Sequence, residues 1–206
     1  MRTRVKICGL TRADEALMAV ESGADAIGLV FYEPSPRNVS IELAAEIAAA
    51  IPAFVTKTAL FVNPSKEFVE QVVQSVNLDL LQFHGSESAD FCRQFNRTYI
   101  KAVAMKDDID LDALAEEYAD SAGLLLDTYK KGVPGGTGES FNWERVPQGF
   151  VKPIILAGGL TPENIAQAVQ QTRVWAVDVS GGVEFAKGRK SSEKVQKFIQ
   201  EVMSAV

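Results

Sequence analysis

Short apolar runs recur along the chain, separated by longer segments that mix apolar and polar residues. The runs do not alternate between apolar and polar positions, which is the pattern of strands buried on both faces of a parallel sheet. Eight runs have this character, and we predict a strand in each of them: residues 5–8, 26–31, 58–62, 80–83, 100–104, 124–126, 154–157 and 176–179.

The segments between the runs carry the spacing of amphipathic helices. Apolar residues follow an i, i+3, i+4, i+7 pattern, which places them on one helix face. Clear examples lie at positions 13, 16, 17 and 20, at 111, 114, 115 and 118, and at 195, 198, 199 and 202. Ser40 is a predicted helix N-cap, and Thr161-Pro162-Glu163 predicts an N-cap followed by a proline at the first helical position.

A strand followed by a helix, eight times over, fits two α/β architectures: a closed (β/α)8 barrel and a doubly wound open sheet. The open sheet typically carries a G-x-G-x-x-G fingerprint after its first strand. Here the first run is followed by Gly9-Leu10-Thr11-Arg12, which lacks that fingerprint, and no linker divides the chain. We therefore predict a single-domain (β/α)8 TIM barrel over residues 1–206, with the open sheet as the alternative.

Composition and charge limit the kinds of partner that the chain is expected to bind. The chain has 206 residues, with 21 Lys plus Arg against 27 Asp plus Glu and a net charge of −6. Without a basic run, such a chain is not expected to bind nucleic acid. The longest apolar stretch, 43–55, is interrupted by Glu46 and Pro52 and is too short to span a membrane. Two cysteines, one histidine and no apolar leader favour a cytoplasmic protein without a disulfide framework or a histidine-based metal site.

In such a barrel, function is expected at the carboxyl ends of the strands. Two glycine-rich turns follow the seventh and eighth strands there, Gly158-Gly159 and Ser180-Gly181-Gly182. Backbone N–H groups at this place frequently bind phosphate, so we predict a phosphorylated small-molecule ligand; two ordinary tight turns are the alternative. The glycine-rich segment 130–139 after the sixth strand is either an anion-binding or lid loop or a plain surface loop.

Two side chains at strand ends could transfer protons. Asp127 ends an apolar run, where burial favours the protonated carboxyl that a general acid needs; the alternative is an aspartate that stabilises the loop. Cys8 could act as a thiolate base, although a lone cysteine is more often a small buried apolar residue. Lys6 faces the same side of the strand and could favour the thiolate. Its expected partner is nevertheless Asp178 of the eighth strand, because a lysine inside a barrel needs a counter-charge.

Two further side chains are candidates for substrate binding. Arg37, in the loop after the second strand, could clamp a carboxylate through its planar fork or could be a solvated surface arginine. His84, after the fourth strand, could orient a substrate or cap a turn. No G-x-S-x-G elbow accompanies this histidine, which argues against a hydrolase with a catalytic triad.

Seven motifs in order make the chain resemble the phosphoribosylanthranilate isomerase family of tryptophan biosynthesis. They are KICGLT at 6–11, SPR at 35–37, QFHG at 82–85, LLDT at 125–128, GGTG at 135–138, LAGGL at 156–160 and VDVSGGVE at 177–184. The resemblance implies a (β/α)8 barrel that uses no cofactor. The implied reaction is an Amadori rearrangement of N-(5′-phosphoribosyl)anthranilate to 1-(2-carboxyphenylamino)-1-deoxyribulose 5-phosphate, the third step of tryptophan synthesis from chorismate.

The resemblance also implies roles for single residues. Asp127 would be the general acid that opens the furanose ring, and Cys8 the general base that removes the C2′ proton. Arg37 would bind the anthranilate carboxylate, His84 and Asp178 would complete the substrate-binding set, and the two glycine turns would bind the phosphate. The chain departs from the family pattern at Asn38, where a bulkier residue is expected, and at Asn142, where an aspartate is expected.

Two other functions stay open at this point. The histidine-pathway aminoaldose–ketose isomerase shares the Amadori chemistry, but an aspartate is expected there at the position of Cys8. A non-catalytic barrel that only binds a sugar phosphate would keep the glycine turns without needing Cys8 and Asp127 together. The sequence allows either a monomer or a homodimer.

Overall fold

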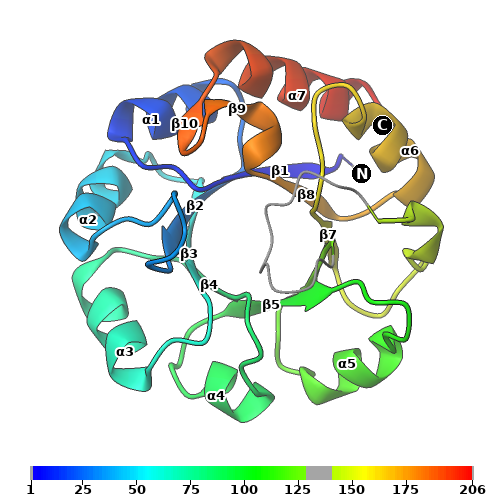
Figure 1. The fold of residues 1–206 in the computed structure, drawn as a ribbon, viewed down its shortest axis with the longest axis horizontal. Coiled ribbons are helices and arrows are strands. Elements are labelled where there is room, and N and C mark those ends of the chain that lie inside the picture. Colours follow the sequence, from blue (N-terminus) through cyan, green and yellow to red (C-terminus); the bar gives the residue numbers. More distant parts are fainter. Residues whose placement is uncertain (1, 129–140, 206) are drawn as a thin grey trace.

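Eight parallel strands form a closed barrel in chain order, and the last strand pairs with the first (Figure 1). The structure is a computed structural model, and it describes residues 2–128 and 141–205. The strands are β1 (Arg4–Cys8), β2 (Ala26–Phe31), β3 (Thr56–Phe61), β4 (Leu80–Phe83), β5 (Tyr99–Ala104), β6 (Leu124–Asp127), β7 (Ile154–Leu156) and β8 (Ala176–Val179). The predicted closed barrel is confirmed, and the open sheet is excluded.

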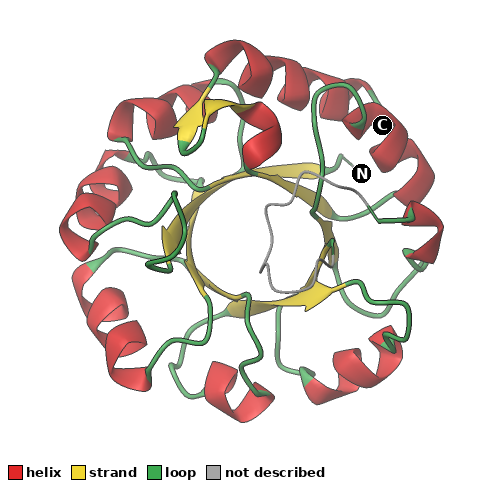
Figure 2. Cartoon of the chain, viewed as in Figure 1, coloured by secondary structure: helices red, strands yellow, loops and turns green. Residues whose placement is uncertain are grey.

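Helices form a ring around the strands, as Figure 2 shows. Within the described residues they are α1 (Ala13–Glu21), α2 (Ile41–Ala50), α3 (Lys66–Ser75), α4 (Ala89–Arg93), α5 (Leu111–Glu117), α6 (Ile165–Thr172) and α7 (Ser192–Ser204). In that part of the chain, no helix is long and apolar enough to cross a membrane. The barrel therefore has the two layers that a (β/α)8 fold requires, strands inside and helices outside.

The predicted helix starts are right in one case and wrong in the other. The Ser40 side chain caps α2 by accepting a hydrogen bond from the Leu43 N–H at 3.2 Å. The helix predicted to begin at Thr161-Pro162 begins instead at Ile165, although the Thr161 hydroxyl accepts a hydrogen bond from the Glu163 N–H at 3.2 Å, as predicted for a cap. The reason is a local turn, because the Asn164 amide accepts from the Thr161 N–H at 2.8 Å and donates to the Gly159 carbonyl at 2.9 Å.

Two connections differ from the predicted repeat. In the described part of the β6–β7 connection, a single 3-10 turn, η1 (Trp143–Arg145), replaces an α-helix. After β8 the chain forms a further 3-10 turn, η2 (Gly181–Val183), and a small hairpin of β9 (Glu184–Ala186) and β10 (Arg189–Lys190) that the apolar pattern did not predict. The predicted glycine-rich loop 130–139 lies outside the described residues.

The inside of the barrel is layered. Apolar side chains of the later strands form a buried cluster, which includes Ile100, Ala102, Leu125, Ile155 and Ala176. Period-two alternation along a strand then places the polar or reactive side chains two residues further on at the carboxyl ends, as with Leu125 and Asp127 on β6. The packing therefore leaves polar groups at one end of the barrel, where they can meet a ligand.

Candidate active site

A cavity of about 780 Å³ opens at the carboxyl ends of the strands. It is lined by the side chains and glycine turns that the sequence analysis named as candidate catalytic, substrate-binding and phosphate-binding residues: Cys8, Arg37, His84, Asp127, Gly158, Gly159, Asp178, Ser180, Gly181 and Gly182. These residues span most of the chain, so closure of the barrel is what brings them together. A concave site with few polar groups and apolar walls is the usual form of a small-molecule site.

The thiol of Cys8 lies beside a buried ion pair. Lys6 Nζ donates to Asp178 Oδ1 at 2.9 Å, and both side chains are less than a tenth exposed. The predicted pairing of Lys6 with the eighth strand is thus confirmed, and the β1–β8 register sets the two residues opposite each other. Burial, and more weakly the Asp178 carboxylate, raise the pKa of Cys8, whereas the Lys6 ammonium, and more weakly Lys190, act to lower it. Lys6 therefore supports the thiolate in addition to neutralising Asp178.

A glycine of β2 makes room for this group. A side chain at Gly28 would place its Cβ 2.7 Å from Cys8 Sγ and 2.9 Å from Lys6 Nζ, too close for any residue larger than glycine. The sequence analysis did not single out Gly28. The available signal was a glycine inside an apolar strand, which often marks a close approach by another group.

The carboxyl of Asp127 is held from two sides. Its Oδ1 accepts from the Thr128 N–H at 2.7 Å, and its Oδ2 lies 3.0 Å from His84 Nε2. Gly158, with φ +80°, packs against this carboxyl, since an added Cβ would lie 2.7 Å from Asp127 Oδ1. The glycine predicted for phosphate binding is therefore also needed for the position of the candidate acid.

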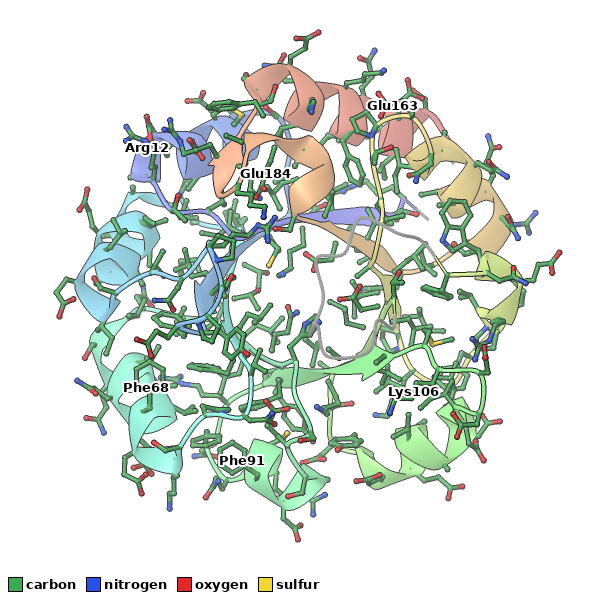
Figure 3. All side chains as sticks on the ribbon, viewed as in Figure 1. Arg12, Phe68, Phe91, Lys106, Glu163 and Glu184 are labelled. Atoms are coloured by element: carbon green, nitrogen blue, oxygen red, sulfur yellow. The ribbon has the colours of Figure 1, made fainter. Side chains whose placement is uncertain are left out.

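The guanidinium of Arg37 is held by Glu184, to which the sequence analysis assigned no role. Glu184 accepts two hydrogen bonds from Arg37, at 2.7 Å from Nε and 2.8 Å from Nη2. Glu184 also pairs with the fully buried Lys190 at 2.9 Å, and Lys190 donates to the Ser180 carbonyl at 3.1 Å. The alternative of a solvated Arg37 is wrong. Figure 3 labels Glu184 on the segment after β8, inside the ring of helices.

Charge explains why Glu184 stays ionised. Burial alone would raise the pKa of Glu184, but Arg37 and Lys190 together hold it below its ordinary value. The same carboxylate raises the pKa of Arg37. Glu184 thus fixes the fork of Arg37 in one orientation. Two of the five guanidinium N–H groups are used in this contact, and three remain for a ligand.

The two glycine turns pack against each other. Gly158 and Gly159 have φ values of +80° and +63°, which favour glycine, and they follow β7. Across from them, a Cβ on Gly182 would collide with the Leu160 carbonyl, so glycine is required there as well. Within residues 2–128 and 141–205, no group of three or more His, Cys, Asp and Glu side chains is arranged to hold a metal ion.

Comparison with known proteins gives one family. Residues 5–201 match the family model described as N-(5'phosphoribosyl)anthranilate (PRA) isomerase. The N-(5'-phosphoribosyl)anthranilate isomerase of Nitrosococcus oceani is 54% identical over 204 residues, which are 99% of this chain and 99% of that protein. The crystal structure of phosphoribosyl anthranilate isomerase from Thermotoga maritima superposes with a TM-score of 0.90 at 37% identity, over 98% of this chain and 99% of the other.

A second crystal structure of a phosphoribosyl anthranilate isomerase contains reduced 1-(o-carboxyphenylamino)-1-deoxyribulose 5-phosphate. It superposes with a TM-score of 0.84 at 36% identity, again over 98% of this chain and 99% of the other. The similarity therefore covers nearly the whole chain, including each strand that contributes to the cavity. This chain belongs to the N-(5'-phosphoribosyl)anthranilate isomerase family.

Proposed function

We propose that this isomerase converts N-(5′-phosphoribosyl)anthranilate into 1-(2-carboxyphenylamino)-1-deoxyribulose 5-phosphate with Asp127 as general acid and Cys8 as general base. The observation that carries the proposal is that both side chains line one cavity, together with an arginine and two glycine turns. The substrate has a carboxylate at one end and a phosphate at the other, and this cavity offers a cationic fork and backbone turns to receive them. The reaction belongs to tryptophan synthesis.

Ring opening is assigned to Asp127. The carboxyl proton passes to the furanose ring oxygen while the C1′–O bond breaks, which leaves a Schiff base between C1′ and the anthranilate nitrogen. The carboxylate that remains keeps its hydrogen bond from the Thr128 N–H at 2.7 Å and faces His84 Nε2 at 3.0 Å. The hydrogen bond from the Thr128 N–H favours the charged product of the proton transfer, so it assists this step.

Proton abstraction is assigned to Cys8. As a thiolate, its sulfur removes the C2′ proton, and the electron pair moves through C1′ to the nitrogen to give an enolamine. Tautomerisation then returns a proton to C1′ as the C2′ hydroxyl loses one, which leaves a ketone and no net change in protons. Lys6 supports the thiolate because its ammonium acts against the raising effect of burial on the pKa of Cys8.

Binding is assigned to the residues at the rim. The three free N–H groups of Arg37 are available to the anthranilate carboxylate, since Glu184 occupies the other two. Gly158, Gly159 and the Ser180–Gly182 turn are assigned to the phosphate group, and His84 and Asp178 form the wall between the two ends of the ligand.

The test is loss of phosphoribosylanthranilate fluorescence on adding the purified protein, without metal or cofactor. Asp127→Asn and Cys8→Ser should each lower kcat by about 10²–10⁴-fold, the usual weight of one general acid or base. Cys92→Ser is the matched control, because this second buried thiol lies in α4 and does not line the cavity. Near wild-type kcat for Asp127→Asn or Cys8→Ser would refute that residue's role. Ligand binding without turnover by the wild type would favour a non-catalytic barrel.

A further inference from the structure

A third side chain extends the pair formed by His84 and Asp127. Gln82 Nε2 lies 2.9 Å from His84 Nδ1, and His84 Nε2 lies 3.0 Å from Asp127 Oδ2. Gln82 is on β4 and is fully buried inside the barrel. It does not line the cavity, so it cannot touch a ligand there. Any effect of Gln82 on the reaction must therefore pass through His84.

The chemistry of the amide decides which imidazole nitrogen carries the proton. In the orientation of this amide, its nitrogen faces His84 Nδ1, and because an amide nitrogen donates and does not accept, Nδ1 is the acceptor in this contact. A neutral imidazole then has its single proton on Nε2, and this N–H donates to Asp127 Oδ2. The arrangement thus aims an N–H group at the oxygen on which negative charge forms when Asp127 gives up its proton.

The opposite tautomer would work against the same step. With its proton on Nδ1, the imidazole would present an Nε2 lone pair to the Asp127 carboxylate, and two acceptors would face each other at about 3 Å. Among the described residues, the cavity is also lined by other ionisable groups, and no hydrogen bond joins any of them to this carboxylate oxygen: Cys8, Tyr32, Arg37, Asp178, Glu184 and Lys187.

The other polar atom of the Gln82 amide, Oε1, is buried and has no hydrogen-bond partner in the described part of the chain. An unpaired buried carbonyl typically costs about 1–3 kcal/mol. Among the described residues, Thr58 on β3 also has an unpaired buried polar atom, so the feature that indicates a role for Gln82 is the contact of its nitrogen with a histidine of the site.

We propose that Gln82 is a positioning residue that holds His84 as the Nε2–H tautomer and so keeps a hydrogen-bond donor on Asp127. The inference rests on the proposed role of Asp127 as the general acid. Loss of the Gln82 amide leaves the imidazole free to adopt either tautomer. The acid step then slows, while the groups that bind the two anionic ends of the substrate are untouched.

Nuclear magnetic resonance of the imidazole nitrogens tests the tautomer directly, because His84 is the single histidine of the chain. With isotopically labelled histidine and ligand-free protein at mildly alkaline pH, the wild type should show protonated Nε2 and unprotonated Nδ1. Gln82→Met should show a mixture of both tautomers. Gln82→Glu, which keeps the side-chain length and offers an acceptor, should move the proton to Nδ1, and it serves as second variant if the methionine variant fails to fold.

Thr58→Val is the matched control. Thr58 is fully buried on the neighbouring strand β3, and its hydroxyl also lacks a partner among the described residues. This variant removes a buried polar atom from the same strand wall without touching His84, so the tautomer should stay as in the wild type. In kinetics, Gln82→Met should lower kcat by about tenfold or more, the scale of partners that orient a functional ligand, with little change in KM.

The outcomes separate this proposal from the proposed function. A wild-type proton on Nδ1, an unchanged tautomer in Gln82→Met, or the same change in Thr58→Val would overturn the role of Gln82, whatever the activity. Absence of turnover by the wild type would instead refute the catalytic roles, while the tautomer would still be measured. A mixed tautomer in Gln82→Met, together with lower kcat and unchanged KM, supports the proposal.

Discussion

Two buried lysines of this barrel each pair with a carboxylate, on opposite sides of the strand wall. Lys6 pairs with Asp178 inside the barrel at 2.9 Å, and Lys101 pairs with Glu87 on the helix side at 2.8 Å. In both pairs each side chain is less than a tenth exposed. The two ion pairs are therefore similar in burial and in N–O distance, and they differ in the other groups that each lysine contacts.

The remaining donors of the two lysines go to different groups. Lys101 donates to the carbonyls of Phe83 and Gly85 as well as to Glu87, so each of its three N–H groups has an acceptor. Glu87 in turn accepts from the Gly85 N–H, which closes the loop after β4. Lys6 donates to its carboxylate, and its ammonium also acts to lower the pKa of the Cys8 thiol.

Each lysine also has a cysteine nearby, and access to the cavity separates the two thiols. Burial raises the pKa of Cys92 to about 12, and Lys101 lowers it only in part. Cys92 is fully buried and does not line the cavity, whereas Cys8 does. A lysine near a buried thiol is therefore not evidence of catalysis. The Lys6–Asp178 pair can affect the reaction, because the Lys6 ammonium acts on the Cys8 thiol and this thiol lines the cavity.

The largest effect is expected for Lys6→Met. The substitution removes the cation that opposes the effect of burial on the pKa of Cys8, so this pKa rises further and the thiolate becomes rarer. It also leaves the Asp178 carboxylate buried without its partner. We expect kcat per folded molecule to fall by about 10²–10³-fold, close to loss of the base itself, measured with the folded fraction from circular dichroism. A loss of less than about threefold would mean that the Lys6–Asp178 pair contributes only to structure, like the Lys101–Glu87 pair.

The matching substitution on the helix side, Lys101→Met, should act mainly on stability. Removing one partner of a buried pair typically costs about 3–5 kcal/mol, and here it also frees the loop carbonyl of Gly85. We expect the free energy of unfolding, measured with urea, to fall by this amount. Activity per folded molecule should fall by less than about tenfold, because Lys101 does not line the cavity. A larger kinetic loss would remove the distinction between the two pairs.

Much of the fold followed from local pattern. Each predicted strand overlaps a strand of the barrel, because an apolar run buried on both faces has few other structures open to it. The site positions Cys8 and Asp127 followed from the same pattern, since each is the last residue of its strand. The pairing of Lys6 with Asp178 followed from closure, which makes the first and last strands neighbours.

What the sequence did not reveal depends on contacts between distant segments. Arg37 and Glu184 are 147 residues apart, and neither lies in a periodic segment, so no local pattern joins them. The role of Gln82 was hidden for a different reason, because period-two spacing places Gln82 and His84 on the same face but does not show that the amide contacts the imidazole. The 3-10 turn η1 in the described part of the β6–β7 connection was not predicted, because the regular repeat of strand and helix in the other units was extended to this one.

Arg37→Lys extends the comparison to an arginine at the rim. Lysine keeps the charge but loses the planar fork, so it cannot hold Glu184 by two bonds and still present several donors to a carboxylate. We expect KM to rise by about tenfold with a smaller change in kcat, measured by steady-state kinetics. Arg12→Lys is the control, because Arg12 forms the same two-bond contact with Asp14 on the exposed surface. An equal rise in KM for both substitutions would show that the effect does not depend on the position of Arg37 at the cavity.

The smallest effect concerns the reactivity of Cys8 with an alkylating reagent. Because burial raises the pKa of Cys8 above its ordinary value, the thiol is mostly protonated at neutral pH, and only the thiolate reacts. In a Cys92→Ser background, the rate should rise by about tenfold per pH unit from pH ~7 to ~8 without levelling. Lys101→Met should leave the rate unchanged across this range. A plateau near neutral pH would mean that the thiolate is already formed and that the Lys6 cation outweighs burial.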